Sequence, residues 1–141
     1  CGFCRQSVSD VDRLIKAHPD LRVVIRELPI LSPQSEDAAR MALAAAEQGK
    51  YPAFHRLMFA AGQPGPDSIE AAARAADVDL AKAREAARSE RIEGELIRNM
   101  ELARTLGFSG TPSWIVGDEV MTGAVGMDRL AEAIEAARQA K

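Results

Sequence analysis

The sequence predicts an α/β domain that is mostly helical, and three observations support this prediction. A C-x-x-C motif formed by Cys1 and Cys4 opens a segment with helical hydrophobic periodicity. Residues 23–25 are a β-branched run, which is typical of a strand buried on both faces of a sheet. In residues 113–122, two short β-type runs flank a Gly-Asp dipeptide that suits a two-residue hairpin turn. A helix followed directly by a buried strand is half of a βαβ unit.

The composition supports one soluble, alanine-rich domain. The 141 residues are 47% hydrophobic, 28% charged and only 4% aromatic, which favours helices packed closely on small side chains. The formal net charge is -3, and no basic patch suited to nucleic acid is present. No apolar run approaches the roughly 20 residues that a membrane-spanning helix needs.

The first predicted helix begins at the C-x-x-C motif. Its apolar stripe runs through Cys4, Val8, Val11 and Ile15, which have helical spacing and to which Leu14 adds width. The helix ends before Pro19, because proline disfavours α geometry in the residue before it.

Capping signals and turn residues place the remaining helices. The first of these helices is predicted to start at Ser35 or Asp37 and to end at Gln48, and the second to start near Pro52. A third is capped by Asp67 or Ser68 and ends at about Ala76, and a fourth is capped by Asp79 and ends near Gly107. The last is capped by Asp128. The strands of the hairpin are expected at 113–116 and 119–122. We expect one domain over residues 1–141, with a helical insertion at about 35–108.

The C-x-x-C motif at a helix start suits thiol–disulfide exchange. Unpaired backbone N–H groups and the positive end of the helix dipole both favour the thiolate of Cys1 and lower its pKa. Cys4 lies one turn inside the helix and is less accessible, so it can attack a mixed disulfide formed by Cys1. We therefore interpret Cys1 as the nucleophile and Cys4 as the resolving thiol. Gly2 lets a substrate chain come close, and Phe3 adds no charge.

Other interpretations of the two cysteines are weaker. A zinc site needs two more ligands, and His18 and His55 do not have the H-x₃₋₅-H spacing, so no metal site is expected. A lipidated N-terminal cysteine would explain neither Cys4 nor the helix behind it. A plain core role for Cys4 is compatible with its being a buried resolving thiol.

A second motif, Thr111-Pro112, strengthens the redox interpretation of the C-x-x-C motif. Thr111-Pro112 precedes the hairpin, and a proline there can simply start a strand or can form a cis peptide bond. Together with C-x-x-C and a terminal helix, this resembles the thioredoxin fold. In that family the proline is cis and lies beside the nucleophilic cysteine, and the preceding residue offers backbone groups to substrate. The resemblance therefore implies substrate binding by Thr111 and Pro112.

The long helical insertion narrows the resemblance. The order of C-x-x-C, ELPIL, an alanine-rich helix, QGKYPAFHRLMF and GFSGTPSWIV is similar to the bacterial DsbA-like (DsbA/BdbD-type) thiol–disulfide oxidoreductases. The resemblance covers essentially the whole chain. It also implies a strand before Cys1 that this chain lacks, so we expect that the domain is truncated at its N-terminus.

The resemblance implies a function and its setting. The expected activity is that of a dithiol oxidase that introduces disulfides into exported proteins, with no cofactor beyond the redox-active Cys1–Cys4 disulfide. Its implied partners are reduced or unfolded exported proteins and a quinone-linked membrane reoxidase, in a periplasmic or otherwise extracytoplasmic bacterial compartment. Membrane anchoring, with the signal sequence outside this chain, and oligomeric state are left open.

Two rival functions remain at this point. One is a disulfide isomerase or reductase on the same fold, and the other is a non-catalytic binding lipoprotein or chaperone. Gly2 and Phe3 replace the Pro-His of the best-known oxidase, and this dipeptide tunes how oxidising the pair is. Glu27 is either a solvated acid at a strand end or a charged residue below the active-site helix that affects proton transfer to Cys4.

Overall fold

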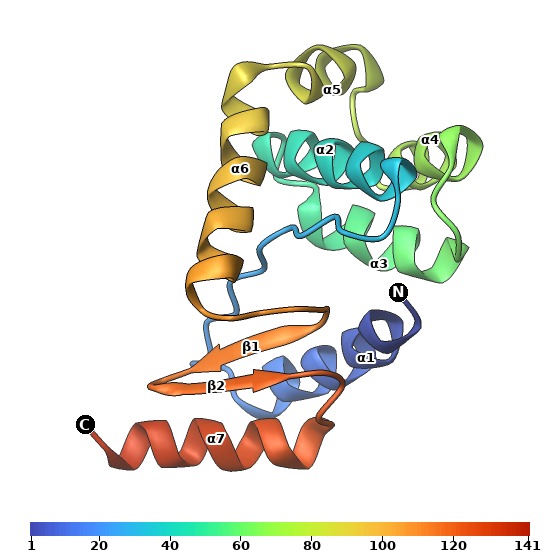
Figure 1. Ribbon diagram of the computed structural model, residues 1–141. Helices are drawn as coiled ribbons and strands as arrows, with labels where there is room; N and C mark the ends of the chain where they lie inside the picture. The colour runs from blue at the N-terminus through green and yellow to red at the C-terminus, as the bar shows by residue number, and fades with distance from the viewer. The chain divides into compact units, whose positions relative to one another are not determined.

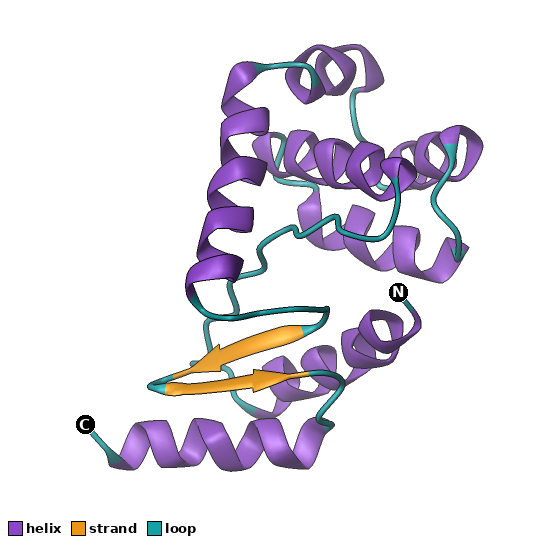
Figure 2. Ribbon diagram, viewed as in Figure 1, coloured by secondary structure: helices purple, strands orange, loops and turns teal.

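The computed structural model describes residues 1–141, and the chain forms two compact units that are described separately. The first unit contains residues 1–25 and 102–141, and the second contains residues 26–101. The elements, labelled in Figure 1 and coloured by type in Figure 2, are α1 (Gly2–Ala17), α2 (Pro33–Glu47), α3 (Tyr51–Ala61), α4 (Pro66–Ala75), α5 (Leu80–Ala87), α6 (Glu90–Thr105), β1 (Ser113–Val116), β2 (Glu119–Thr122) and α7 (Met127–Gln139).

The first unit is built around the predicted hairpin. β1 pairs antiparallel with β2, and the register places Ser113 opposite Thr122 and Val116 opposite Glu119. Both strand ranges predicted from the sequence are confirmed. The turn between them contains Gly117 with a φ of +60°, a conformation that glycine adopts without steric cost. α7 packs against both β1 and α1, and the core of the unit contains Leu14, Met121, Leu130, Ala133 and Ile134.

The predicted buried strand at 23–25 is wrong for this structure. Residues 21–30 contain no strand, and the side chains of this run are exposed, with Val24 at 62%. The sheet consists of β1 and β2 alone. A strand exists through hydrogen bonds to a neighbouring strand, and residues 23–25 have no such neighbour in the described chain. The β-branched pattern therefore indicates that the segment favours an extended conformation, but it does not indicate whether a neighbouring strand is present.

The buried face of α1 also differs from the predicted apolar stripe. Ile15 is 41% exposed, and Val8 and Val11 are only half-buried. The buried residues of α1 are Ser7, Asp10 and Leu14. The elements that pack against a helix decide which of its faces is buried. Two of the buried residues of α1, Ser7 and Asp10, are polar. Local bonds lower the cost of their burial, because each polar group then has a partner.

Those local bonds lie within α1. The Ser7 hydroxyl donates to the Phe3 carbonyl at 3.0 Å, and Asp10 accepts from Arg13 at 2.6 Å. Each bond is within one helical turn of its residue. The two polar side chains are therefore satisfied without a partner from another element.

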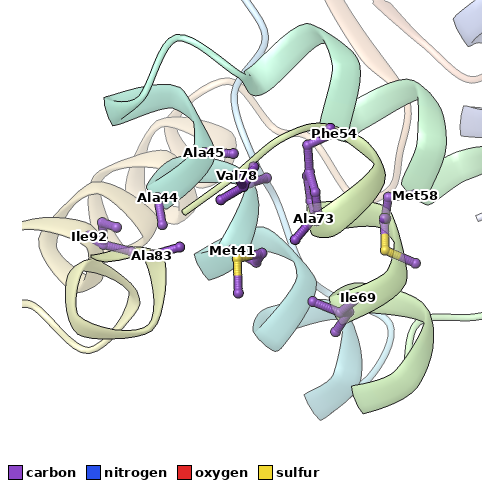
Figure 3. Close-up of a cluster of buried hydrophobic side chains, with 13 residues drawn as sticks. Met41, Ala44, Ala45, Phe54, Met58, Ile69, Ala73, Val78, Ala83 and Ile92 are labelled. Carbon is purple, nitrogen blue, oxygen red and sulfur yellow. The ribbon is translucent and has the colours of Figure 1, made fainter. Parts of the chain in front are cut away.

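The second unit is a helical assembly with a core of alanines and a few larger side chains. Phe54 is its largest fully buried side chain, with an exposed fraction of 1%. Figure 3 shows this core, whose labelled members are Met41, Ala44, Ala45, Phe54, Met58, Ile69, Ala73, Val78, Ala83 and Ile92. Close packing of helices on small side chains, as the composition predicts, is therefore what this unit uses.

The helix starts in the second unit follow local caps, and two of them correct the predictions. α2 begins at Pro33 because Ser32 is its N-cap, and the Ser32 hydroxyl accepts from the Ser35 N–H at 3.1 Å. The single long helix predicted from Asp79 is two helices. Asp79 caps α5 as predicted, but Ser89 accepts from the Ile92 N–H at 3.3 Å and starts α6. Serine side chains compete with helical backbone bonds and favour caps.

Smaller differences affect the remaining helix starts. The predicted caps of two helices are wrong. α4 begins at Pro66 with Gly65 as its N-cap, rather than after Asp67 or Ser68, and α7 begins at Met127 with Gly126 as its N-cap, rather than after Asp128. The second unit, 26–101, overlaps the insertion predicted at about 35–108. That residues 1–141 form a single domain with an insertion remains a prediction.

Candidate active site

The N-terminus of α1 carries the first of the two predicted motifs. Cys1 is the N-cap of this 16-residue helix, and its Sγ accepts a hydrogen bond from the Cys4 backbone N–H at 3.1 Å. The Cys1 carbonyl accepts from the Arg5 N–H at 3.1 Å, so the helical ladder starts at this residue. The predicted position of Cys1 at a helix start is confirmed. Its sulfur lies where the helix dipole and the Cys4 N–H both favour negative charge.

The two cysteines are joined in a disulfide. Their Cα atoms are 5.2 Å apart, within the usual range for such a bond. Cys1 is exposed and Cys4 is half-buried. An attacking thiolate from another protein would therefore reach Cys1 more easily than Cys4.

The second motif lies directly beside this sulfur. The Thr111 hydroxyl donates to Cys1 Sγ at 3.5 Å, and the Thr111 carbonyl oxygen is 3.4 Å from the same sulfur. The Thr111–Pro112 peptide bond is cis, as the resemblance implied. Two motifs 110 positions apart therefore meet at one atom.

The hydroxyl and the carbonyl of Thr111 act on Cys1 in opposite ways. A thiolate at Cys1 would accept from the hydroxyl, which stabilises the negative charge. The carbonyl oxygen favours a protonated thiol, because only the S–H form can donate to it. In the disulfide the sulfur has no proton, and the contact with the carbonyl is close packing.

Two residues beyond the motif hold this loop, and sequence reasoning did not identify them. The Gly123 N–H donates to the Pro112 carbonyl at 2.8 Å, and the Trp114 indole N–H donates to the Gly123 carbonyl at 2.8 Å. Trp114 also packs against the core of the first unit. No local pattern pairs a tryptophan with a particular glycine nine positions later, so the sequence contains no signal for this bond.

Glu27 belongs to the second unit and is not a solvated acid at a strand end. Its carboxyl accepts a hydrogen bond from the Tyr51 hydroxyl, and its backbone carbonyl accepts from the Asn99 amide at 3.0 Å. Burial raises the pKa of Glu27, and the bond from Tyr51 opposes that rise. The pKa of Tyr51 is raised by burial and by the adjacent carboxyl. The sequence did not indicate Tyr51 as the partner.

The dipeptide between the cysteines is exposed. The exposed fraction of Phe3 is 67%, and a Cβ atom at Gly2 would meet no other atom within 4 Å. Gly2 and Phe3 are therefore not required by the packing of the first unit. The structure contains no group of three or more histidine, cysteine and acidic side chains that could hold a metal ion. None of its helices is long and apolar enough to span a membrane.

Solved structures of several bacterial proteins have the same fold. A thioredoxin-like oxidoreductase from Silicibacter pomeroyi is 37% identical, with a TM-score of 0.93 over 100% of this chain and 82% of that one. A periplasmic thioredoxin-like protein from Salmonella enterica is 28% identical, with a TM-score of 0.88 over 97% and 78% of the two chains. The thiol-disulfide exchange protein alpha-DsbA2 from Wolbachia pipientis is 27% identical, with a TM-score of 0.89 over 96% and 75%.

The chain also resembles part of two much larger curated proteins. It is 30% identical over 140 residues to Na(+)/H(+) antiporter NhaA 3 from Salinispora tropica, and 29% identical to NhaA 1 from Salinispora arenicola. The match covers 97% of this chain but only 22% of each relative, so the chain spans about a fifth of their length. Their names describe those whole proteins.

The family assignment rests on the sequence match together with the fold. Residues 1–135 match the family described as DSBA-like thioredoxin domain, which includes both cysteines and the Thr111-Pro112 motif. The structure has the corresponding fold and holds the Cys1–Cys4 disulfide at a helix start. The chain therefore belongs to the DSBA-like thioredoxin domain family.

Proposed function

We propose that this protein is a dithiol oxidase that transfers its Cys1–Cys4 disulfide to reduced proteins. The observation that supports the proposal is the environment of Cys1 Sγ. This sulfur accepts the Cys4 N–H at the start of α1 and is in contact with the Thr111 hydroxyl. Both donors would stabilise a thiolate in the reduced protein. Stabilising the reduced form makes a dithiol pair more oxidising.

The reaction needs two thiols of the substrate and no further cofactor. A substrate thiolate attacks Cys1 Sγ, a mixed disulfide forms, and the Cys1–Cys4 bond breaks with Cys4 leaving as a thiolate. A second substrate thiolate then attacks the substrate sulfur of the mixed disulfide, and Cys1 leaves as a thiolate. The substrate has gained a disulfide and lost two electrons, which the protein now holds as two thiols. Thr111 and Pro112 would lie against the substrate chain at the mixed disulfide.

The proposed setting is extracytoplasmic, in a bacterium. The periplasmic relative from Salmonella enterica supports this compartment. There the substrates would be exported proteins that arrive reduced, and structural disulfides are found mainly in such oxidising compartments. A quinone-linked membrane protein would take the two electrons and restore the disulfide.

Three residues would tune the reaction in this proposal. Gly2 and Phe3 lie between the cysteines and would help set the redox potential. Glu27 would affect proton transfer to Cys4, so Glu27→Gln should change the pH dependence of the second exchange step. An unchanged pH profile would remove Glu27 from the mechanism and leave it a structural role with Tyr51.

The decisive experiment compares oxidation with isomerisation. The protein is equilibrated against glutathione buffers, and it is then mixed in its disulfide form with a reduced, unfolded protein that has two thiols. An oxidase should be reduced at a more oxidising glutathione poise than a thioredoxin-type reductase, and it should form the substrate disulfide stoichiometrically. Failure to oxidise the substrate, with rapid rearrangement of a scrambled-disulfide protein, would show an isomerase. With the scrambled-disulfide protein, the Cys1 thiolate of Cys4→Ala should attack a substrate disulfide, release one substrate thiolate and accumulate as the mixed disulfide, because no resolving thiol remains. Cys1→Ser should form none.

A further inference from the structure

We propose that Trp114 is a positioning residue for Cys1, acting through Gly123 and the Thr111-Pro112 loop. The inference rests on the proposed role of Cys1 as the attacked and leaving sulfur. Trp114 itself does not touch the disulfide in any hydrogen bond of the structure. Its indole N–H instead donates to the Gly123 carbonyl, and the Gly123 N–H in turn donates to the Pro112 carbonyl in the Thr111-Pro112 loop.

The indole bond is the first step of this connection. Trp114 is half-buried on β1 and packs against the core of the first unit. An indole N–H is only a donor, and it usually finds an acceptor when the ring is buried. Here the acceptor is the Gly123 carbonyl at 2.8 Å, which also accepts the Val125 N–H at 3.0 Å. The carbonyl is therefore held by two donors.

Gly123 passes this restraint to the loop. Its N–H donates to the Pro112 carbonyl at 2.8 Å, immediately beyond the last paired residue of β2. The φ of Gly123 is +86°, a backbone conformation that L side chains rarely adopt. This conformation lets one residue direct its carbonyl to Trp114 and its N–H to Pro112. The indole bond restrains the peptide plane after Gly123, and the bond to Pro112 restrains the plane before it, so the two bonds are linked through the φ and ψ of this one residue.

The loop itself is short and is held at both ends. The Ser113 hydroxyl donates to the Gly110 carbonyl at 2.7 Å, and Pro112 is held by Gly123. Thr111 lies between these two restraints. Its hydroxyl and carbonyl oxygens are 3.5 Å and 3.4 Å from Cys1 Sγ, respectively.

The contact from Thr111 to the sulfur is sensitive to the position of the loop. The Thr111 hydroxyl is 3.5 Å from the sulfur, and the strength of its bond depends on alignment, because hydrogen bonds weaken steeply as their angles depart from ideal. A displacement of the loop would therefore weaken the donation to a Cys1 thiolate. Loss of the indole bond should therefore make the Cys1 thiolate less stable relative to the thiol, although neither cysteine is changed.

A double-mutant cycle on the reduced protein tests this connection. The variants are Trp114→Phe, Thr111→Val and the double variant, and the measurements are the pH dependence of Cys1 alkylation and the equilibrium with glutathione. Each single substitution should make the protein a weaker oxidant by roughly twofold to tenfold, since both remove the same hydroxyl donation. The double variant should be no weaker than the weaker single variant, because the donation can be lost only once.

Two outcomes would overturn the proposal. The first is a Trp114→Phe protein with unchanged Cys1 alkylation and an unchanged glutathione equilibrium. The second is a double variant whose effect is the product of the single effects, which would show that the residues act independently. A wild-type protein that fails to oxidise a reduced substrate would contradict the proposed function while leaving the cycle on Cys1 interpretable.

Controls separate positioning from loss of packing. Ile115→Val alters the next residue of β1, whose side chain is 52% exposed, and should leave Cys1 reactivity unchanged. Gly117→Ala should destabilise the hairpin turn and should also leave Cys1 reactivity unchanged. If Trp114→Phe does not fold, replacing Trp114 with 3-benzothienylalanine removes the N–H and keeps the ring shape. That variant should reproduce the weakened thiolate, and wild-type reactivity in it would reject the proposal.

Discussion

Cys1 Sγ lies 3.5 Å from the Thr111 hydroxyl and 3.4 Å from the Thr111 carbonyl oxygen. A single residue thus presents a donor and an acceptor to the sulfur that the proposed reaction uses. Only the donor can stabilise a thiolate, and the Cys4 N–H at the helix start acts in the same direction. The balance between these donors and the carbonyl acceptor should set the stability of the Cys1 thiolate in the reduced protein.

We expect Thr111→Val to raise the pKa of the Cys1 thiol and to make the protein a weaker oxidant. The hydroxyl donation is lost while the size of the side chain is nearly kept. A net loss of about 0.5–1.5 kcal/mol corresponds to a change of roughly twofold to tenfold in the equilibrium with glutathione. Iodoacetamide alkylation across a pH series gives the pKa. Thr122→Val, an exposed change on β2, is the matched control and should change neither quantity.

We expect Glu27→Gln to flatten the pH dependence of stability. Burial raises the pKa of Glu27 above 4.5, so the folded state binds its proton more tightly than the unfolded state does. The stability that this proton contributes is fully present below pH 4.5 and is lost as the pH rises through the folded pKa. Urea unfolding from pH 4 to pH 8 (roughly the range over which carboxyl pKa values are raised by burial) measures this loss.

The control for Glu27 is Glu132→Gln, an exposed change on α7. It should retain the wild-type decline of stability with pH. A Glu27→Gln protein with the same decline as the wild type would show that another group is responsible.

We expect Gly117→Ala to destabilise the hairpin by about 1–3 kcal/mol. The substitution is unfavourable for two reasons. A φ of +60° is strained for an L side chain, and the new Cβ atom would be 2.8 Å from the Cβ of Ala137 on α7, which is too close. Gly107→Ala is unfavourable for the first reason only, because its φ is +72° and its Cβ would meet no atom within 4 Å. Denaturant unfolding of both variants separates the terms. Equal losses would mean that α7 moves aside at little cost.

We expect Phe54→Ala to reduce the stability of the second unit by about 3–5 kcal/mol, because it leaves a cavity among small side chains that cannot collapse to fill it. Phe54 is 1% exposed, in the core shown in Figure 3. Phe3→Ala removes the same ring from a position that is 67% exposed and should change stability by less than about 0.5 kcal/mol. Similar losses in the two variants would contradict the assignment of the core.

Features encoded by neighbouring residues were predictable. The helix start at Cys1, the two hairpin strands and the Asp79 cap each depend on a few adjacent positions, and each is confirmed. The break between α5 and α6 is also local, since Ser89 caps the second helix, but the helical period on both sides conceals it. Residues 23–25 show the opposite case, because a β-branched run becomes a strand only beside another strand.

The sequence by itself determined the chemistry of this protein: two cysteines at a helix start and a Thr-Pro pair before a hairpin. Spacing and capping act over a few residues, so they can be recognised in the chain. Only the tertiary structure decided that Thr111 meets Cys1, that Tyr51 meets Glu27, and that an indole holds the loop through Gly123. Each of these contacts joins residues that are apart in the sequence. Their distances depend on how the chain packs, which no local pattern records.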